Sequence, residues 1–302
     1  MSRRGWILFA TMCVIWGVPY LLIKVAVEDL APATLVLART GLAALVLLPI
    51  ALLQGQVGAL RRVWRPLAVY TLFEICGPFL LLAHAETRLS SSITGLLIAA
   101  VPIVGAVLAR VSGSREQLGP RRLTGLLLGV AGVAALVGLD VATDDLLAVL
   151  AVAGVVLGYA IGPIILARRL SDQPGLGVVA VSLALAALVY LPAGLAQAPS
   201  QWPSARVLAA VLTLALVCTA LAFLVFFQLI AEVGPARATV ITYVNPAVAV
   251  LLGVLVLDER FTVVTAIGFV LVLGGSVLAT ARTREAPPAS AEAAPASVVA
   301  CP

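Results

Sequence analysis

The stretch PLAVYTLFEICGPFLLLAHA, residues 66–85, is twenty residues long and contains one carboxylate, Glu74, and no lysine or arginine. A run of about 20 apolar residues has the length of a helix that crosses the hydrocarbon core of a bilayer. A charged side chain is unfavourable in that core, so it is usually functional or paired. The stretch therefore predicts a transmembrane helix and makes Glu74 the first functional candidate.

The composition of the whole chain extends this prediction. Hydrophobic residues make up 62% of the 302 residues and charged residues 11%, against roughly 25% charged in a soluble domain. The apolar runs do not alternate as the strands of a membrane barrel do, so helices are expected. We predict an all-α integral membrane protein with ten transmembrane helices, at residues 6–25, 33–53, 66–85, 91–111, 123–139, 146–167, 175–196, 207–230, 238–257 and 262–280.

The distribution of basic residues predicts the orientation. With a cytoplasmic N-terminus, fourteen arginines fall in the segments on the inner side and four basic residues, Lys24, Arg88, Arg206 and Arg260, fall outside. Such an excess marks the cytoplasmic side. We expect a multi-pass protein of the bacterial inner membrane with both termini in the cytoplasm.

The two halves of the chain repeat. An offset of 144 residues relates Pro19 to Pro163 and Pro102 to Pro246. An offset of 143 relates Glu116 to Glu259, Gly125 to Gly268 and Gly132 to Gly275. Each half contains five spans, an odd number, so the second copy must be inverted in the membrane, as in many secondary transporters. We predict one repeat at residues 1–141, a second at 142–281 and a disordered, Ala- and Pro-rich cytoplasmic tail at 282–302.

Two stretches of the chain are WGVPYLLIK at residues 16–24 and NPAVAVLLGVLVLDERFTVVTAIGFVLVLGG at residues 245–275. Both resemble the EamA-type family of the drug/metabolite transporter superfamily. The family pattern of proline, acidic residue and glycines corresponds to Pro246, Glu259, Gly268 and Gly275, and LVLART around Arg39 is similar to its second helix. The connection RVSGSREQLGP is longer than the family's usual turn. The resemblance implies transport, as export or import, of a small metabolite or drug-like solute through a central cavity.

The sequence gives less support to functions other than transport. Lys24 is the single lysine, so no Walker A motif is possible. We expect no enzyme activity, cofactor, metal or nucleic-acid partner. The expected partners are a small-molecule solute such as an amino acid or amine, coupled protons and the lipid bilayer, for a monomer or homodimer that exports its solute. The alternatives are an intramembrane enzyme, which needs a nucleophile and a base in one cavity, and a transporter-like scaffold that handles lipid.

Glu74 leaves three interpretations open. It pairs with Arg39, it binds a cationic or amine-bearing solute, or it carries the coupling proton, since a carboxylate in low dielectric favours its protonated form. Tyr70 precedes it by four residues, which places its hydroxyl on the same face of an α-helix. Gly77 and Pro78 follow and can open the backbone.

The remaining candidates are polar or aromatic residues inside the predicted spans, and prolines that can interrupt them. The residues expected to bind solute or take part in coupling are Glu74, Arg39, Trp16, Tyr20, Tyr70, Tyr159, Gln228, Thr242, Tyr243 and Asn245. The residues expected to form hinges or helix breaks are Pro19, Pro78, Pro102, Pro163 and Pro246.

Overall fold

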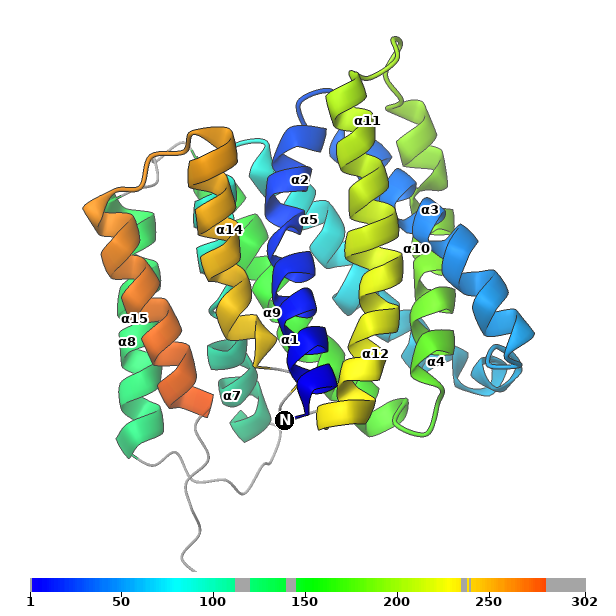
Figure 1. Ribbon diagram of the computed structural model, residues 1–302, viewed down its shortest axis with the longest axis horizontal. Coiled ribbons are helices and arrows are strands. Elements are labelled where there is room, and N and C mark those ends of the chain that lie inside the picture. The colour runs from blue at the N-terminus through cyan, green and yellow to red at the C-terminus, as the bar shows by residue number, and fades with distance from the viewer. Residues whose placement is uncertain (1, 112–119, 140–144, 235–237, 239, 281–302) are drawn as a thin grey trace, which may run out of the picture.

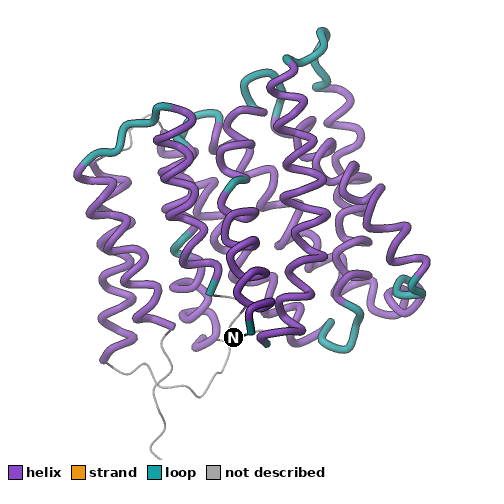
Figure 2. Tube along the Cα trace, in the orientation of Figure 1, coloured by secondary structure: helices purple, strands orange, loops and turns teal. Residues whose placement is uncertain are grey.

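The computed structural model describes residues 2–111, 120–139, 145–234, 238 and 240–280, and these ranges contain helices and short connections without a strand (Figures 1 and 2). The first half contains α1 (Arg3–Gly17), α2 (Pro19–Ala26), α3 (Pro32–Leu53), η1 (Gly58–Val63), α4 (Trp64–Thr71), η2 (Leu72–Cys76), α5 (Gly77–Glu86), α6 (Ser91–Ile98), α7 (Val101–Val111) and α8 (Pro120–Leu139). The second half contains α9 (Leu146–Arg169), α10 (Gly175–Ala196), α11 (Ala205–Leu212), η4 (Thr213–Leu221), α12 (Ala222–Val233), α14 (Ile241–Leu257) and α15 (Val263–Thr280).

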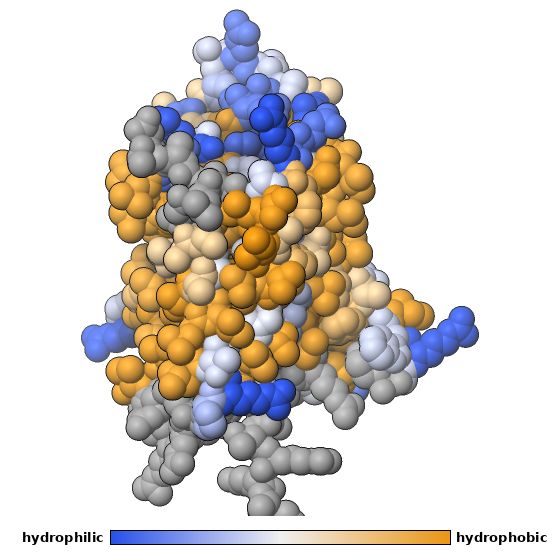
Figure 3. All heavy atoms as spheres, turned by 90° about the vertical axis from the view of Figure 1, so that its left-hand side faces the viewer, coloured by the Kyte–Doolittle hydropathy of each residue, from blue (hydrophilic) through white to orange (hydrophobic). Residues whose placement is uncertain are grey.

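Each predicted apolar run is mainly helical over the residues that the structure describes. Seven helical segments in the described chain are long and apolar enough to cross a membrane, and three shorter apolar helices accompany them. The third segment, Gly58–Glu86, is longer than predicted because a 3₁₀ turn at Gly58–Val63 and the first two residues of α4 precede the apolar run. Figure 3 shows apolar side chains over the middle of one face, with hydrophilic residues gathered at its two ends. This distribution fits a multi-pass membrane protein.

The prolines do not all interrupt helices. Pro19 begins α2 where α1 has ended, and Pro102 follows the short break between α6 and α7. Pro163 and Pro246, their counterparts in the second half, lie inside the continuous helices α9 and α14. The structure therefore contradicts a helix break at these two positions, whereas a hinge role for them stays a prediction. A membrane helix tolerates proline where neighbouring helices satisfy the carbonyl groups it leaves without a partner.

Two antiparallel pairs of helices join the halves: α3 packs along α10, and α8 packs along α15 (Figure 1). Small residues allow the close approach. A Cβ atom at Gly275 would lie 2.5 Å from the backbone nitrogen of Gly129, and Thr34 donates to the carbonyl of Gly194 at 2.9 Å. Further contacts join α5 to α9, α12 to α1, and α6 to α14.

Two segments of the bundle wind as π-helix. Residues Leu72–Cys76 form η2 between α4 and α5, and residues Thr213–Leu221 form η4 between α11 and α12. Wider π turns are uncommon and occur frequently at functional sites. Pro78 lies immediately after η2, at the second residue of α5. The two π segments lie at equivalent places in the halves, in the third and eighth apolar runs.

Candidate functional site

Arg39 lies inside the bundle on α3, with 8% of its surface exposed. Its Nε donates a hydrogen bond to Oγ1 of Thr219 in η4, at 3.0 Å. Its guanidinium carbon lies 3.8 Å from the centre of the Phe79 ring, which is the geometry of a cation–π contact. The Thr219 hydroxyl in turn donates to the carbonyl of Leu214 at 2.8 Å. The charge of Arg39 is thus held from two sides.

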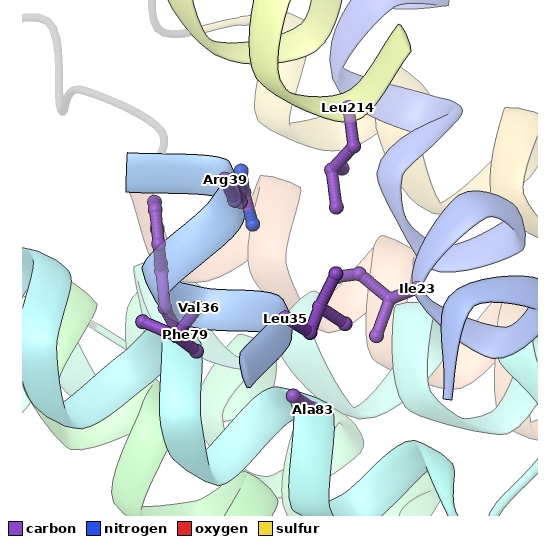
Figure 4. Close-up of a pocket in the computed structure, with 7 residues that line it drawn as sticks. All are labelled: Ile23, Leu35, Val36, Arg39, Phe79, Ala83 and Leu214. Carbon is purple, nitrogen blue, oxygen red and sulfur yellow. The ribbon is translucent and has the colours of Figure 1, made fainter. Parts of the chain in front are cut away.

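Apolar side chains surround the guanidinium of Arg39. It borders a narrow pocket lined by Ile23, Leu35, Val36, Phe79, Ala83 and Leu214 (Figure 4). Among the described residues, Thr219 is the single hydrogen-bond partner of this guanidinium, through Nε. A guanidinium has five N–H donors and binds carboxylates through two parallel bonds. Arg39 therefore has donors free for an anionic group, in surroundings that suit the apolar part of a solute.

Glu74 lies in η2 and faces α9. A side chain at Gly162 would collide with its Oε2 atom, so the glycine provides the space that the carboxylate occupies. Oε2 is buried and has no hydrogen-bond partner among the described residues. One face of α9 carries a glycine at every fourth residue: Gly154, Gly158 and Gly162. Because these glycines have no side chains, η2 and α5 pack closely against this face. Packing holds Glu74 in place, while its charge has no partner.

Arg39 and Glu74 do not form an ion pair in the described part of the chain. The interpretation of Glu74 as the partner of Arg39 is therefore wrong. The start of α3 and the end of α5 lie at the same side of the bundle. Arg39 lies about 10 Å along α3 from the first of these ends, and Glu74 lies about 18 Å from the second, so the two residues lie at different depths. Tyr159 of α9 interacts electrostatically with both charges, and Tyr20 of α2 interacts with Arg39 and Tyr159. Polar groups from five helical segments thus gather in the interior.

Comparisons with known proteins agree with this architecture. The model of the EamA-like transporter family matches residues 3–138 and again residues 146–281. The chain belongs to the EamA-like transporter family. The chain is similar to a protein named "Uncharacterized inner membrane transporter YedA" in Escherichia coli strain K12 and to the protein of the same name in strain O157:H7. Each is 28% identical to this chain over 250 residues, which cover 82% of this chain and 80% of the relative.

A solved structure described as "Crystal structure of protein" has the same fold. It superposes with a TM-score of 0.66 and covers 92% of this chain and 98% of the other, at 22% sequence identity. The two family matches divide the EamA-like chain into two repeats with a boundary between residues 138 and 146. This chain is therefore a membrane transporter of two EamA-like repeats.

The other predicted site residues of this EamA-like protein have different surroundings. Tyr20 is buried, Tyr159 is half-buried, and Trp16 contacts the ring of Phe226 with centroids 4.7 Å apart. Thr242 and Tyr243 are half-buried in α14 and make further contacts there. Asn245, with its amide oriented to suit its neighbours, donates to the carbonyls of Ile241 at 3.0 Å and Cys13 at 3.2 Å. Asn245 therefore joins α14 to α1.

Two expectations are corrected. Tyr70 makes no hydrogen bond to Glu74 within the described chain, although the two residues interact electrostatically. Tyr70 packs instead with Leu67 and Val178. Gln228 lies on the exposed face of α12, whereas its neighbour Leu229 is fully buried. Gln228 therefore does not line the interior in this conformation.

The nucleophile and base considered for an intramembrane enzyme lie partly outside the described residues. His84, the single histidine, is exposed near the end of α5. The serines of the stretch Val111–Arg115 lie outside the described residues, as does Glu116.

Sequence reasoning did not identify three neighbours of the charged residues: Thr219, Phe79 and Gly162. The glycines of α9 carry a signal that would have found Gly162, because their spacing of four residues marks one face of a helix. Thr219 and Phe79 carry no comparable signal. In the sequence they resemble any other residue of an apolar helix, and only their contacts with Arg39 in the structure identify them.

Proposed function

We propose that this protein is a secondary transporter of the bacterial inner membrane that moves a small amino acid or amine, or a drug-like solute of similar size, by alternating access. Export is the direction we infer. The observation that carries the proposal is a pair of separated interior charges. Arg39 has free donors beside an apolar pocket, and Glu74 has a buried, unpartnered carboxylate oxygen.

The arrangement of the helices supports an inverted repeat. The family matches make α3 equivalent to α10 and α8 equivalent to α15, and each pair runs antiparallel. The two π segments also lie in equivalent helices. We propose ten transmembrane helices in two inverted repeats, at residues 1–141 and 142–281, followed by a cytoplasmic tail at 282–302. The exchange of two equivalent arrangements gives such a protein one state open to each side.

A guanidinium, together with a buried carboxyl group that ionises when an ammonium group approaches it, favours a zwitterionic solute. A carboxylate on the solute can accept two hydrogen bonds from Arg39, and its ammonium group can approach Glu74. Tyr159 interacts electrostatically with both Arg39 and Glu74, so it belongs to the same interior region. The space beside Arg39 is too narrow for a water molecule in this conformation, so solute entry requires the halves to move apart. Tyr20, Trp16, Thr242 and Tyr243 belong to the helices that would move.

Counterflow in proteoliposomes tests the solute class. Vesicles are loaded with an unlabelled monocarboxylate, an amine or an amino acid, and entry of the corresponding labelled solute is measured. We expect counterflow of the amino acid to exceed that of compounds that carry one of the two groups. Equal rates for all three, or no rate above protein-free vesicles, would contradict the proposal.

Reporter fusions test the inversion separately. A fusion after Asp140 is expected on the outer side, and a fusion after Arg169 on the cytoplasmic side. A cytoplasmic signal after Asp140 would contradict the inverted repeat.

A further inference from the structure

A cluster of charged residues lies at one end of the bundle, around the connection between α5 and α6. Lys24, on the last turn of α2, donates from Nζ to the carbonyl oxygens of Glu86 and Leu89, at 2.8 Å each. Carbonyls at the C-terminal end of a helix lack partners within the helix, and a cation there is favourable. Lys24 therefore holds the end of α5 from within the first repeat.

The second repeat holds the same connection from its other side. The carboxylate of Glu259 accepts hydrogen bonds from the backbone nitrogens of Ser91 at 2.7 Å and Ser92 at 2.9 Å, and from the Ser92 hydroxyl. It thereby satisfies free N–H groups at the start of α6. Gly253 lies against this contact, where any side chain would collide with the carboxylate of Glu259. Glu259 thus ties the second repeat to the first.

Glu86 lies between these two attachments and has no such partner. Its side chain is 0% exposed, and neither carboxylate oxygen has a hydrogen-bond partner among the described residues. The charged and titratable groups that interact with it come from three other elements: Lys24 and Tyr20 of α2, Arg39 of α3, and Glu259 of the connection between α14 and α15. A buried carboxyl group without a donor favours its neutral form. Its own helix contributes no ion pair to it in the described chain.

We propose that Glu86 is a proton-binding site that controls opening of this end of the transporter. The inference rests on alternating access as proposed above. With its proton bound, Glu86 is neutral and both attachments are intact, as in this structure. When Glu86 releases the proton to water, its carboxylate attracts the Lys24 ammonium away from the two carbonyls and repels the carboxylate of Glu259. The repulsion of Glu259 weakens the contact between the repeats, and the displacement of Lys24 loosens the end of α5 that this contact holds.

Cysteine labelling tests this proposal without knowledge of the solute. Ala83 lines the pocket beside Arg39, one helical turn from Glu86, and is 1% exposed. The probe is Ala83→Cys in a chain whose four native cysteines are replaced by serine. Right-side-out vesicles are treated with a membrane-impermeant maleimide at several pH values. Trp202→Cys in the same background corrects for the pH dependence of the thiol, because Trp202 is 90% exposed beyond the same end of the bundle.

We expect the corrected labelling of the Ala83→Cys chain to rise with pH. Addition of Glu86→Gln, which cannot lose a proton, should keep labelling low at every pH. Glu259→Gln should raise labelling roughly tenfold at all pH values, as removal of a charge-assisted hydrogen bond predicts. Glu28→Gln is the matched control, since Glu28 is an exposed carboxylate near the same end that contacts Arg206.

Labelling that is independent of pH in the parent chain would overturn the proposal, as would the same pH response in Glu86→Gln. A response to sodium in place of pH would also overturn it. None of these outcomes bears on counterflow by the parent protein. Failure of this inference is therefore distinguishable from failure of the proposed transport function.

Discussion

The two interior charges have opposite surroundings. Arg39 has a hydrogen bond to Thr219 and lies over the Phe79 ring, whereas Glu74 has an enclosed oxygen that no donor in the described chain contacts. Arg39 packs against side chains of three helical segments, and Glu74 packs against the glycine face of α9. This contrast indicates that the bundle fixes the cation in one position but leaves the carboxylate chemically available. We expect Arg39 to serve as a fixed anchor and Glu74 as the group whose partner changes during transport.

The largest effect is expected from Arg39→Met, which keeps the length of the side chain and removes its charge. Loss of a bidentate, charge-assisted contact should lower transport by roughly a hundredfold. The thermal midpoint should stay the same or rise, because an apolar side chain often replaces a buried charge without loss of stability. Counterflow and thermal unfolding in detergent measure the two effects. If the Arg39→Met variant lost its fold together with its activity, the role of Arg39 would be structural.

The second prediction concerns the unpartnered charge. Glu74→Gln keeps the shape of the side chain and should lower transport about tenfold through loss of one charged contact. Insertion into the membrane should be unchanged, as judged by the amount of protein in purified membranes. The exposed carboxylate Glu28 provides the control variant Glu28→Gln, which should transport normally. Full activity of Glu74→Gln would remove this residue from the mechanism.

The third prediction tests whether Gly162 positions Glu74. A Cβ atom at Gly162 collides with the carboxylate, so Gly162→Ala should displace Glu74 and lower transport by about threefold through a shifted contact. Gly154→Ala on the same helix is the matched control. Its Cβ would meet only the flexible end of Leu81, at 2.8 Å. Equal effects of the two variants would point to a general requirement for close helix packing.

The smallest effect is expected from Thr219→Val, which removes the hydrogen bond to Arg39 and preserves the shape of the side chain. Hydrogen bonds between membrane helices contribute about 0.6 kcal/mol on average. The Phe79 contact remains, so transport should fall less than about twofold. Phe79→Leu with Thr219→Val should then lower transport more than the two single effects together. A large effect of Thr219→Val alone would mean that Arg39 is less firmly held than its contacts indicate.

The sequence predicted the helical architecture because apolar runs of bilayer length have few alternative structures. The described parts of the predicted runs are mainly helical, and the repeated pattern of Pro102, Pro246 and the paired glycines agrees with two family matches. The ends of Gly175–Ala196 were predicted without error, since proline and polar residues flank this run. The third run was extended by a 3₁₀ turn, which has no apolar signature.

The site was less predictable because its geometry depends on changes in helical register. Glu74 lies within the π turns of η2, and no residue type within Leu72–Cys76 marks such a turn. Burial of Gln228 could not be judged either, because polarity does not reveal which face of α12 packs inward. The prolines at 163 and 246 match interruptions in the first half, yet local packing keeps both helices continuous.

Transport itself is tested by comparing the solutes inside and outside cells that contain this protein, its Glu74→Gln variant or neither. We predict that the parent protein changes the distribution of at least one small amino- or amine-bearing solute, with accumulation outside the cell. Cells with Glu74→Gln should show this change to a much smaller degree, in line with a roughly tenfold loss of transport, at equal amounts of membrane-inserted chain. An unchanged distribution with the parent protein, or an identical change with the variant, would contradict a transport mechanism that depends on Glu74.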